Sequence, residues 1–211
     1  MESVRRVEEA LIIDDYYLPE LIYRHHGLTS PKSQTFLNQL CRGGKLKVLE
    51  LGCYAGASSL AMLFNNDVEL TVVDNWSAVE DRPANESIPY TPIENPREIF
   101  LSLVDNLNVD VIEGDIFDVE VNLNLIQKRF DIIFYDGPHN LELILGFMML
   151  YAPLFKPGTI LVIDDYNFPS VQMGVEIGLD ELGLSTVYKK EILTDGESKN
   201  DFWNGLGIFI F

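Results

Sequence analysis

The chain has 211 residues, 47% hydrophobic and 23% charged, which is typical of one globular domain with its own core. Its net charge of −18 repels phosphate backbones and anionic lipid, so nucleic-acid and membrane-surface roles are disfavoured. The sequence shows no membrane span, no signal peptide and only two cysteines, Cys41 and Cys53, so we expect a cytoplasmic protein without disulfides.

Short β-branched runs alternate with helical patterns along the chain. This alternation predicts an α/β fold with a Rossmann-like, doubly wound, mostly parallel sheet and helices on both faces. The expected strands are Lys45–Leu51, Glu69–Asp74, Val109–Glu113, Phe130–Tyr135, Thr159–Asp164, Thr186–Glu191 and Leu206–Phe211. The expected helices are Pro31–Cys41, Ala57–Asn65, Pro96–Asn106, Leu141–Leu154 and Val171–Gly183.

Two segments of the single domain have no clear place in this alternation. Residues 1–44 form an N-terminal helical or lid segment, and for the part up to Leu28 we expect either a lid or an oligomer contact. Residues 77–95 carry three prolines and are too long for a routine connection, which indicates a lid over an active site or disorder.

The first informative motif is a glycine turn between a strand and a helix. Gly52 and Gly56 bracket the turn, and a helix is expected to open at Ala57. Glycine lets the backbone approach a ligand, and the helix start offers free N–H groups. Asp74 ends the next strand, where its carboxylate can accept the hydroxyls of a ribose. The pattern predicts a nucleoside cofactor.

The same turn argues against a dinucleotide. A G-x-G-x-x-G fingerprint is absent, because Tyr54 and Ala57 stand where its second and third glycines belong. Glu50 would also place a negative charge near a pyrophosphate. That charge suits a ligand with an ammonium and a sulfonium, so S-adenosylmethionine is favoured over NAD. A third strand ends at Asp115, where an adenine amino group could bind.

The second informative set is three aspartates and a histidine after two later strands. Asp136 follows one expected strand, Asp164 and Asp165 close the next, and His139 lies in the loop after Asp136. Converging carboxylates favour Mg²⁺, Ca²⁺ or Mn²⁺, and the alternative is that Asp136 and Asp165 are turn or capping residues. His139 could accept a proton at neutral pH, or could only hydrogen-bond the following helix.

Together these segments, over Leu46–Tyr166, resemble class I methyltransferases, and most of all metal-dependent O-methyltransferases related to catechol O-methyltransferase. The family motif E-L-G-x-Y-x-G-x-S is matched from Glu50 to Ser58. The resemblance implies cofactor contacts from the matched positions and the later strand ends. These candidates are Glu50, Gly52, Tyr54, Gly56, Ser58, Asp74, Asn75, Asp115, Ile116 and Asp136.

The resemblance also implies a metal held by Asp136, Asp164 and Asp165, with Asp165 standing where the family has asparagine. His139 replaces the family's catalytic lysine, and with Asp136 it forms the candidate catalytic pair. The D-G-x-H and D-D elements resemble a bacterial branch with cephalosporin-hydroxylase-like and macrolide-sugar O-methyltransferases. The family also implies that the last strand is antiparallel.

We therefore expect S-adenosylmethionine-dependent methylation of a hydroxyl on a small metabolite or sugar, assisted by a divalent ion such as Mg²⁺. An NAD-dependent oxidoreductase and a non-catalytic S-adenosylmethionine-binding protein remain as alternatives. We expect a small-molecule partner and no nucleic acid or membrane, with a homodimer as the common default.

Overall fold

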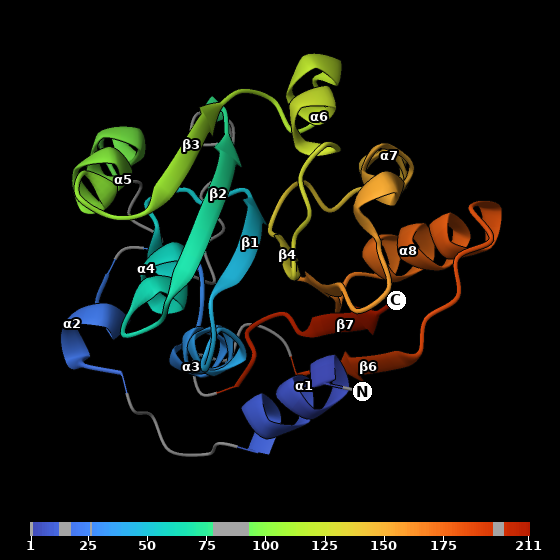
Figure 1. Cartoon of the computed structure of the whole chain (residues 1–211), viewed down its shortest axis with the longest axis horizontal. Coiled ribbons are helices and arrows are strands. Elements are labelled where there is room, and N and C mark those ends of the chain that lie inside the picture. Colours follow the sequence, from blue (N-terminus) through green and yellow to red (C-terminus); the bar gives the residue numbers. More distant parts are fainter. Residues whose placement is uncertain (1, 13–17, 26, 78–92, 196–200) are drawn as a thin grey trace.

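The computed structural model describes residues 2–12, 18–25, 27–77, 93–195 and 201–211. Seven strands form one sheet in the order β3-β2-β1-β4-β5-β7-β6, drawn in Figure 1. The strands are β1 (Leu46–Leu51), β2 (Val68–Asp74), β3 (Val109–Glu113), β4 (Ile132–Tyr135), β5 (Ile160–Ile163), β6 (Tyr188–Ile192) and β7 (Leu206–Ile210).

Strands β1 to β5 pair in parallel, and β7 runs antiparallel between β5 and β6. This confirms the predicted Rossmann-like sheet and its antiparallel last strand. The order reverses between β1 and β4, and such reversals are where open α/β sheets bind their ligands, beyond the carboxyl ends of the strands.

Helices cover both faces of the sheet (Figure 1). They are α1 (Glu2–Ile12), α2 (Glu20–Tyr23), α3 (Pro31–Leu40), α4 (Ala57–Leu63), α5 (Pro96–Val104), α6 (Val119–Leu125), α7 (Leu141–Tyr151), the 3₁₀ turn η2 (Ala152–Leu154) and α8 (Pro169–Glu181). Helices α1, α3, α4 and α5 share one apolar core with the sheet, and α6, α7 and α8 share the other.

Strand β1 shows why the parallel strands are apolar throughout. Val48 packs into the core of the first face and its neighbour Leu49 into the core of the second, and neither is exposed. Successive side chains of a strand point to opposite faces, so a strand covered on both sides needs apolar residues at both.

The structure differs from the sequence-based prediction mainly at short elements. Helix α6 was not expected, because its apolar residues alternate with polar ones at the period of a strand. Asp118 caps it by accepting a hydrogen bond from the backbone N–H of Glu120 at 2.7 Å. The lid expected over residues 77–95 lies outside the described residues, apart from 77 and 93–95.

The N-terminal segment expected to be partly helical contains α1 and α2. Helix α1 packs on α3, where Arg6 donates to the carbonyl oxygens of Leu40, Arg42 and Gly43 at the carboxyl end of α3. Leu40 is the last residue of α3, and its carbonyl has no partner inside the helix, so Arg6 caps α3 there and also binds the carbonyls of Arg42 and Gly43 just beyond it. No helix in the described ranges has the length and apolar character needed to cross a membrane.

Candidate active site at the carboxyl edge of the sheet

Backbone hydrogen bonds bring the candidate residues together at the carboxyl edge. The N–H of Gly114 donates to Asp74, that of Asp136 to Leu51, and that of Asp164 to Tyr135, at 2.9–3.1 Å. Each bond joins the residue after one strand to the end of its neighbour. The predicted cofactor and acid–base residues, which are spread from 50 to 165 in the sequence, therefore line one edge.

The glycine turn touches the loop after β4. Gly52 has φ +89°, and a Cβ there would lie 2.1 Å from the carbonyl oxygen of Asp136. Only glycine permits so close an approach of the two backbones. Gly56 also has a positive φ, +94°, and precedes the first residue of α4. Both glycines are needed for the geometry that the sequence motif predicted.

Asp74 holds this turn in place. Its Oδ2 accepts hydrogen bonds from the backbone N–H groups of Cys53 and Tyr54 at 2.8 and 2.9 Å. Its Oδ1 accepts from the N–H of Trp76 at 2.7 Å, and the Trp76 indole donates to the Tyr54 carbonyl at 2.8 Å. The carboxylate thus ties the end of β2 to the turn after β1. Its expected contact with a ribose stays a prediction.

Glu50 lies in β1, two residues before Gly52, and its side chain is fully buried. Its two carboxylate oxygens accept hydrogen bonds from the hydroxyls of Ser58 and Ser59 in the first turn of α4. Burial raises the pKa of Glu50 to about 8, although both serine bonds lower it. The hydroxyl of Ser58 therefore points to Glu50, and the two residues form a buried pair at the cofactor turn.

The ends of β2 and β3 approach each other beside the turn. Asn75 Nδ2 lies 3.5 Å from Asp115 Oδ2, and Asp115 Oδ1 accepts from the N–H of Phe117 at 2.8 Å. The carbonyl of Ile116 accepts from the hydroxyl of Tyr151. The structure thus brings Asn75 and Asp115 together, as expected if both bind one nucleoside.

His139 pairs with Asp165 across the loops after β4 and β5. Its Nδ1 lies 2.9 Å from Asp165 Oδ2, and its ring stacks on Phe168 with centroids 5.4 Å apart. Asn204 donates to Asp165 Oδ1 at 2.7 Å, so the carboxylate is held from both sides. A carboxylate beside Nδ1 orients the imidazole and favours the tautomer with a proton on Nδ1.

The expected group of three aspartates is not found. In the ranges that the structure describes, no three His, Cys, Asp or Glu side chains are placed to share a metal ion. Asp165 has φ +56° and turns its carboxylate to His139 and Asn204 instead. Asp164 is different: it is 7% exposed, and its Oδ1 has no hydrogen-bond partner in the described part of the chain. Burial, then Asp136 and Asp165, raise its pKa.

Several residues at this edge were not singled out from sequence. Ser59 shares Glu50 with Ser58, Trp76 braces the turn, and Asn204 holds Asp165. His25 Nε2 lies 2.7 Å from the carbonyl oxygen of Ala55 in the turn. Only Ser59 had a local signal, since it follows Ser58 in the motif; the others reach the edge through long-range contacts.

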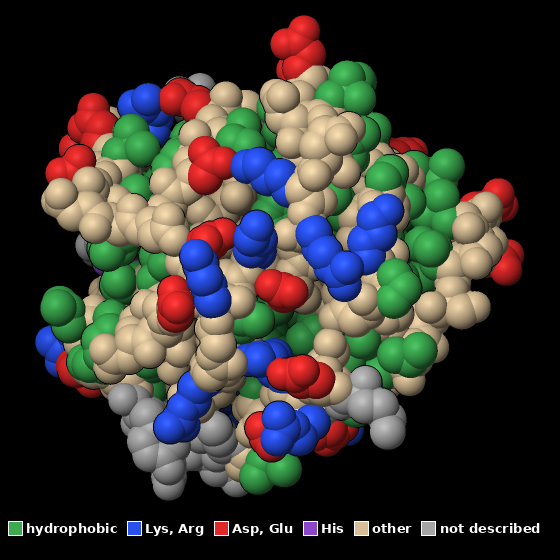
Figure 2. All heavy atoms as spheres, in the orientation of Figure 1, with side chains coloured by type: hydrophobic (Ala, Val, Ile, Leu, Met, Phe, Trp, Pro, Cys, Tyr) green, Lys and Arg blue, Asp and Glu red, His purple; other side chains and the backbone are tan. Residues whose placement is uncertain are grey.

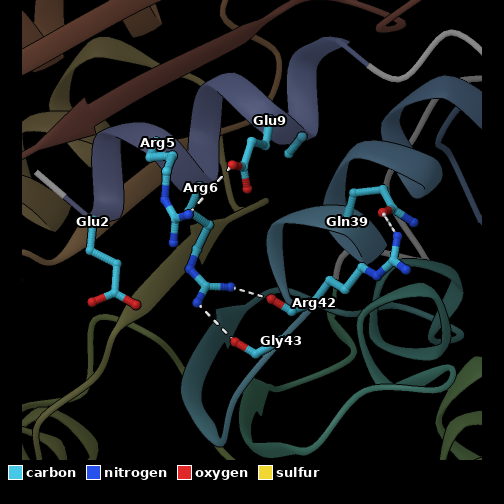
Figure 3. A pocket seen from close by; sticks show the side chains of 8 residues that line it. Glu2, Arg5, Arg6, Glu9, Gln39, Arg42 and Gly43 are labelled. Carbon is cyan, nitrogen blue, oxygen red and sulfur yellow. Dashed lines mark hydrogen bonds and ion pairs between the residues drawn. The ribbon is translucent and has the colours of Figure 1, made fainter.

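A separate pocket of about 350 Å³ lies between α1 and α3, away from this edge (Figure 3). Three arginines line it, but Figure 3 shows each of them turned to a partner: Arg5 to Glu9, Arg6 to backbone carbonyls and Arg42 to Gln39. The pocket shares no residue with the candidate active site.

Figure 2 shows Lys and Arg side chains lying among Asp and Glu on one face of the molecule. The excess of acidic over basic residues is therefore not spread evenly over the surface.

Comparisons with known proteins identify the family of the chain. The sequence matches a family model described as a methyltransferase domain over residues 49–166, which includes the glycine turn and the later aspartates. A search of curated proteins found no match.

Three solved structures share the fold at low identity. An O-methyltransferase from Bacillus cereus in complex with SAH is 19% identical, with a TM-score of 0.61, and the match covers 98% of this chain and 91% of that one. A SAH-bound methyltransferase from Podospora anserina is 17% identical, with a TM-score of 0.59, and the match covers 100% and 95%.

The third structure is fibrillarin from Aeropyrum pernix with bound S-adenosyl-L-methionine, 14% identical with a TM-score of 0.54. That match covers 78% of this chain and 66% of the fibrillarin chain, just under two thirds. These likenesses concern the fold, whereas the family model spans more than half of the sequence and contains the motif residues. The chain belongs to the methyltransferase-domain family.

Proposed function

We propose that the protein transfers a methyl group from S-adenosylmethionine to a hydroxyl oxygen of a small metabolite or sugar. The main observation behind the proposal is that two groups of residues lie at the same carboxyl edge of the sheet. The glycine turn, Asn75 and Asp115 follow β1, β2 and β3, and His139 and Asp165 follow β4 and β5. A nucleoside cofactor and a proton acceptor are the two parts that such a transfer needs.

The cofactor side of the proposal rests on the turn. Gly52 and Gly56 let a ligand approach the backbone, and the free N–H groups at the start of α4 can bind its carboxylate. Asn75 and Asp115 offer polar groups for the adenosine end. Three similar folds hold SAH or S-adenosyl-L-methionine, which supports the same class of cofactor here.

The acceptor side rests on His139. S-adenosylmethionine supplies an electrophilic methyl group on a sulfonium, and the attacking hydroxyl must lose its proton. His139, oriented by Asp165, would accept that proton through its Nε2. Alignment of the hydroxyl with the methyl group would supply much of the rate through proximity. The net charge of −18 supports a small acceptor and not a nucleic acid.

Assistance by a divalent cation such as Mg²⁺ is a further part of the proposal. The unpartnered Oδ1 of Asp164 and the like charge of Asp136 beside it suit a cation, and Mg²⁺ commonly takes only one or two protein carboxylates. Asp136 and Asp164 would hold it, and it would lower the pKa of the acceptor hydroxyl.

A melting scan with S-adenosylmethionine, NAD⁺ or buffer alone, each with and without Mg²⁺, tests the cofactor. A ligand at 100 times its dissociation constant stabilises by about 2.7 kcal/mol, or roughly 5–10 °C for a chain of this size. We expect a shift with S-adenosylmethionine only. A shift with NAD⁺ alone would overturn the proposal and favour an oxidoreductase.

A panel of hydroxylated acceptors with methyl-labelled S-adenosylmethionine tests the reaction. We expect label on an oxygen of at least one acceptor and loss of transfer in EDTA, restored by Mg²⁺. Tight binding of S-adenosylmethionine without turnover on any acceptor would favour a non-catalytic binding protein. Full activity in EDTA would remove the metal from the mechanism.

A further inference from the structure

Part of the N-terminal segment lies against the helix that follows the glycine turn. Helix α2 packs on α4 (Figure 1), where Leu18 and Ile22 share a small apolar core with Ala61. Further along the segment, a Cβ on Gly27 would lie 2.4 Å from the Cβ of Ala57, the first residue of α4. The backbone at Gly27 is therefore in close contact with the start of α4.

One polar contact joins the same segment to the glycine turn itself. Nε2 of His25 lies 2.7 Å from the carbonyl oxygen of Ala55. A carbonyl oxygen can only accept a hydrogen bond, so Nε2 carries the proton and donates it. Ala55 is fully buried, and a buried carbonyl that loses its partner is unfavourable. His25 therefore supplies a hydrogen bond that the turn needs.

This contact holds one peptide plane of the turn from two directions. The carbonyl of that peptide belongs to Ala55 and accepts from His25. Its N–H belongs to Gly56 and donates to the carbonyl of Cys53 at 2.8 Å. Glycine tolerates both signs of φ, so Gly56, at φ +94°, would permit the plane to rotate if one of the two bonds were lost. His25 opposes the rotation that this glycine permits.

We propose that His25 is a positioning residue that fixes the glycine turn for S-adenosylmethionine by its hydrogen bond to the carbonyl of Ala55. The inference rests on the proposed function, which assigns the turn between Gly52 and Gly56 to the cofactor. A loop that is already ordered in its binding conformation loses less entropy when the ligand binds, so the affinity is higher. His25 acts from outside the range of the methyltransferase-domain model, which begins at residue 49.

Removal of the imidazole should weaken ligand binding at the turn. We expect His25→Ala to bind S-adenosylmethionine and S-adenosylhomocysteine about tenfold more weakly than the wild type does, as for the loss of one hydrogen bond. Both ligands should weaken by the same factor, because the contact acts on the turn and not on the methyl group. Isothermal titration calorimetry of the full chain measures both affinities without turnover. Unchanged affinities in His25→Ala would refute the inference.

Two amide substitutions test the reach of the donor. The side-chain nitrogen of glutamine lies about as far from the backbone as Nε2 of histidine, whereas that of asparagine is one bond shorter. We expect His25→Gln to bind both ligands within about threefold of the wild type, and His25→Asn to bind as weakly as His25→Ala. A role of the imidazole in stability alone would not separate the two amides, so equal affinities in these variants would overturn the inference.

Tyr23→Phe is the matched control within the same segment. The Tyr23 hydroxyl accepts from the N–H of Leu18 at 3.1 Å and lies 2.9 Å from Oγ1 of Thr35, so the variant loses contacts that hold α2 and keeps the one to the turn. We expect a lower melting temperature and unchanged affinity for both ligands. An equal loss of affinity in Tyr23→Phe and His25→Ala would mean that any loosening of the segment weakens binding, which would refute a specific role for His25.

Gly27→Ala provides a second test if the His25 variants do not fold, which circular dichroism would show. Its new Cβ, 2.4 Å from that of Ala57, should move the segment away from the turn and weaken the binding of both ligands. Gly146→Ala is the control, because its Cβ would lie 3.7 Å from Phe117 at the nearest, and it should bind as the wild type does. Wild-type affinity in a folded Gly27→Ala would contradict the inference. Failure of the wild type to bind either ligand would instead overturn the proposed function.

Discussion

The Nδ1 atom of His139 lies 2.9 Å from Oδ2 of Asp165, and the two side chains come from loops that follow different strands. The carboxylate is only 12% exposed and is also held by Asn204, so the imidazole is oriented by a fixed partner. Asp165 is therefore engaged by His139 and Asn204, and this ion pair connects the loops that follow β4 and β5.

Removing the proton acceptor should affect turnover and not cofactor binding. We expect His139→Ala to lower kcat by about a hundredfold or more, the usual contribution of a general base. Asp165→Asn should lower kcat by about tenfold, because the imidazole keeps its place but loses its charged partner. Both should leave the S-adenosylmethionine affinity from calorimetry unchanged. A wild-type kcat in His139→Ala would exclude it as the base.

Gly52→Ala should damage both the fold and the cofactor site. The new Cβ would meet the Asp136 carbonyl at 2.1 Å, and φ +89° is unfavourable for alanine. We expect the free energy of unfolding to fall by about 2–4 kcal/mol. Gly43→Ala is the matched control, with φ +75° and nothing within 4 Å, and should lose about 1 kcal/mol from backbone strain alone. Denaturant unfolding measures both, and equal losses would contradict the predicted contact.

Asp74→Ala should loosen the glycine turn. Three backbone N–H groups, those of Cys53, Tyr54 and Trp76, would lose their acceptor. We expect a loss of about 2–4 kcal/mol in the free energy of unfolding and at least a tenfold weaker binding of S-adenosylmethionine. Asp110→Ala removes only an exposed pair with Lys128 and should change either quantity little.

Arg6→Ala should lower stability without changing the active site. The guanidinium binds the carbonyl of Leu40 at the end of α3 and those of Arg42 and Gly43 just beyond it, and its loss should lower the free energy of unfolding by about 1–3 kcal/mol. Arg5→Ala is the neighbouring control, because its pair with Glu9 is exposed at 3.8 Å and should contribute at most about 0.5 kcal/mol. Both variants should bind S-adenosylmethionine as the wild type does; weaker binding would mean that α1 influences the site.

The raised pKa of Glu50 predicts how stability depends on pH in the absence of ligand. The folded value is about 8 and the ordinary value 4.5, so the contribution of Glu50 is fully present below about pH 4.5. It is lost as pH rises toward 8, because the unfolded chain ionises first. The melting temperature of Glu50→Gln minus that of the wild type should therefore increase over this window. A constant difference would mean that Glu50 titrates normally.

The sequence was sufficient for the architecture and for the position of the glycine turn. Continuous apolar runs with helical patterns between them determine a doubly wound sheet, because each parallel strand must be apolar on both faces. The glycines at 52 and 56 are required by positive φ angles and by close backbone contact, which are local constraints that a motif can report.

Only the tertiary structure decided how the carboxylates are used. The carboxylate of Asp165 contacts His139 and Asn204, and that of Asp74 accepts hydrogen bonds from the glycine turn. Glu50 is buried and accepts hydrogen bonds from two serines. A single sequence shows that such residues end strands, but not which partner each side chain meets. Those partners lie up to 39 residues away along the chain, and they are selected by competition among hydrogen bonds in the folded protein.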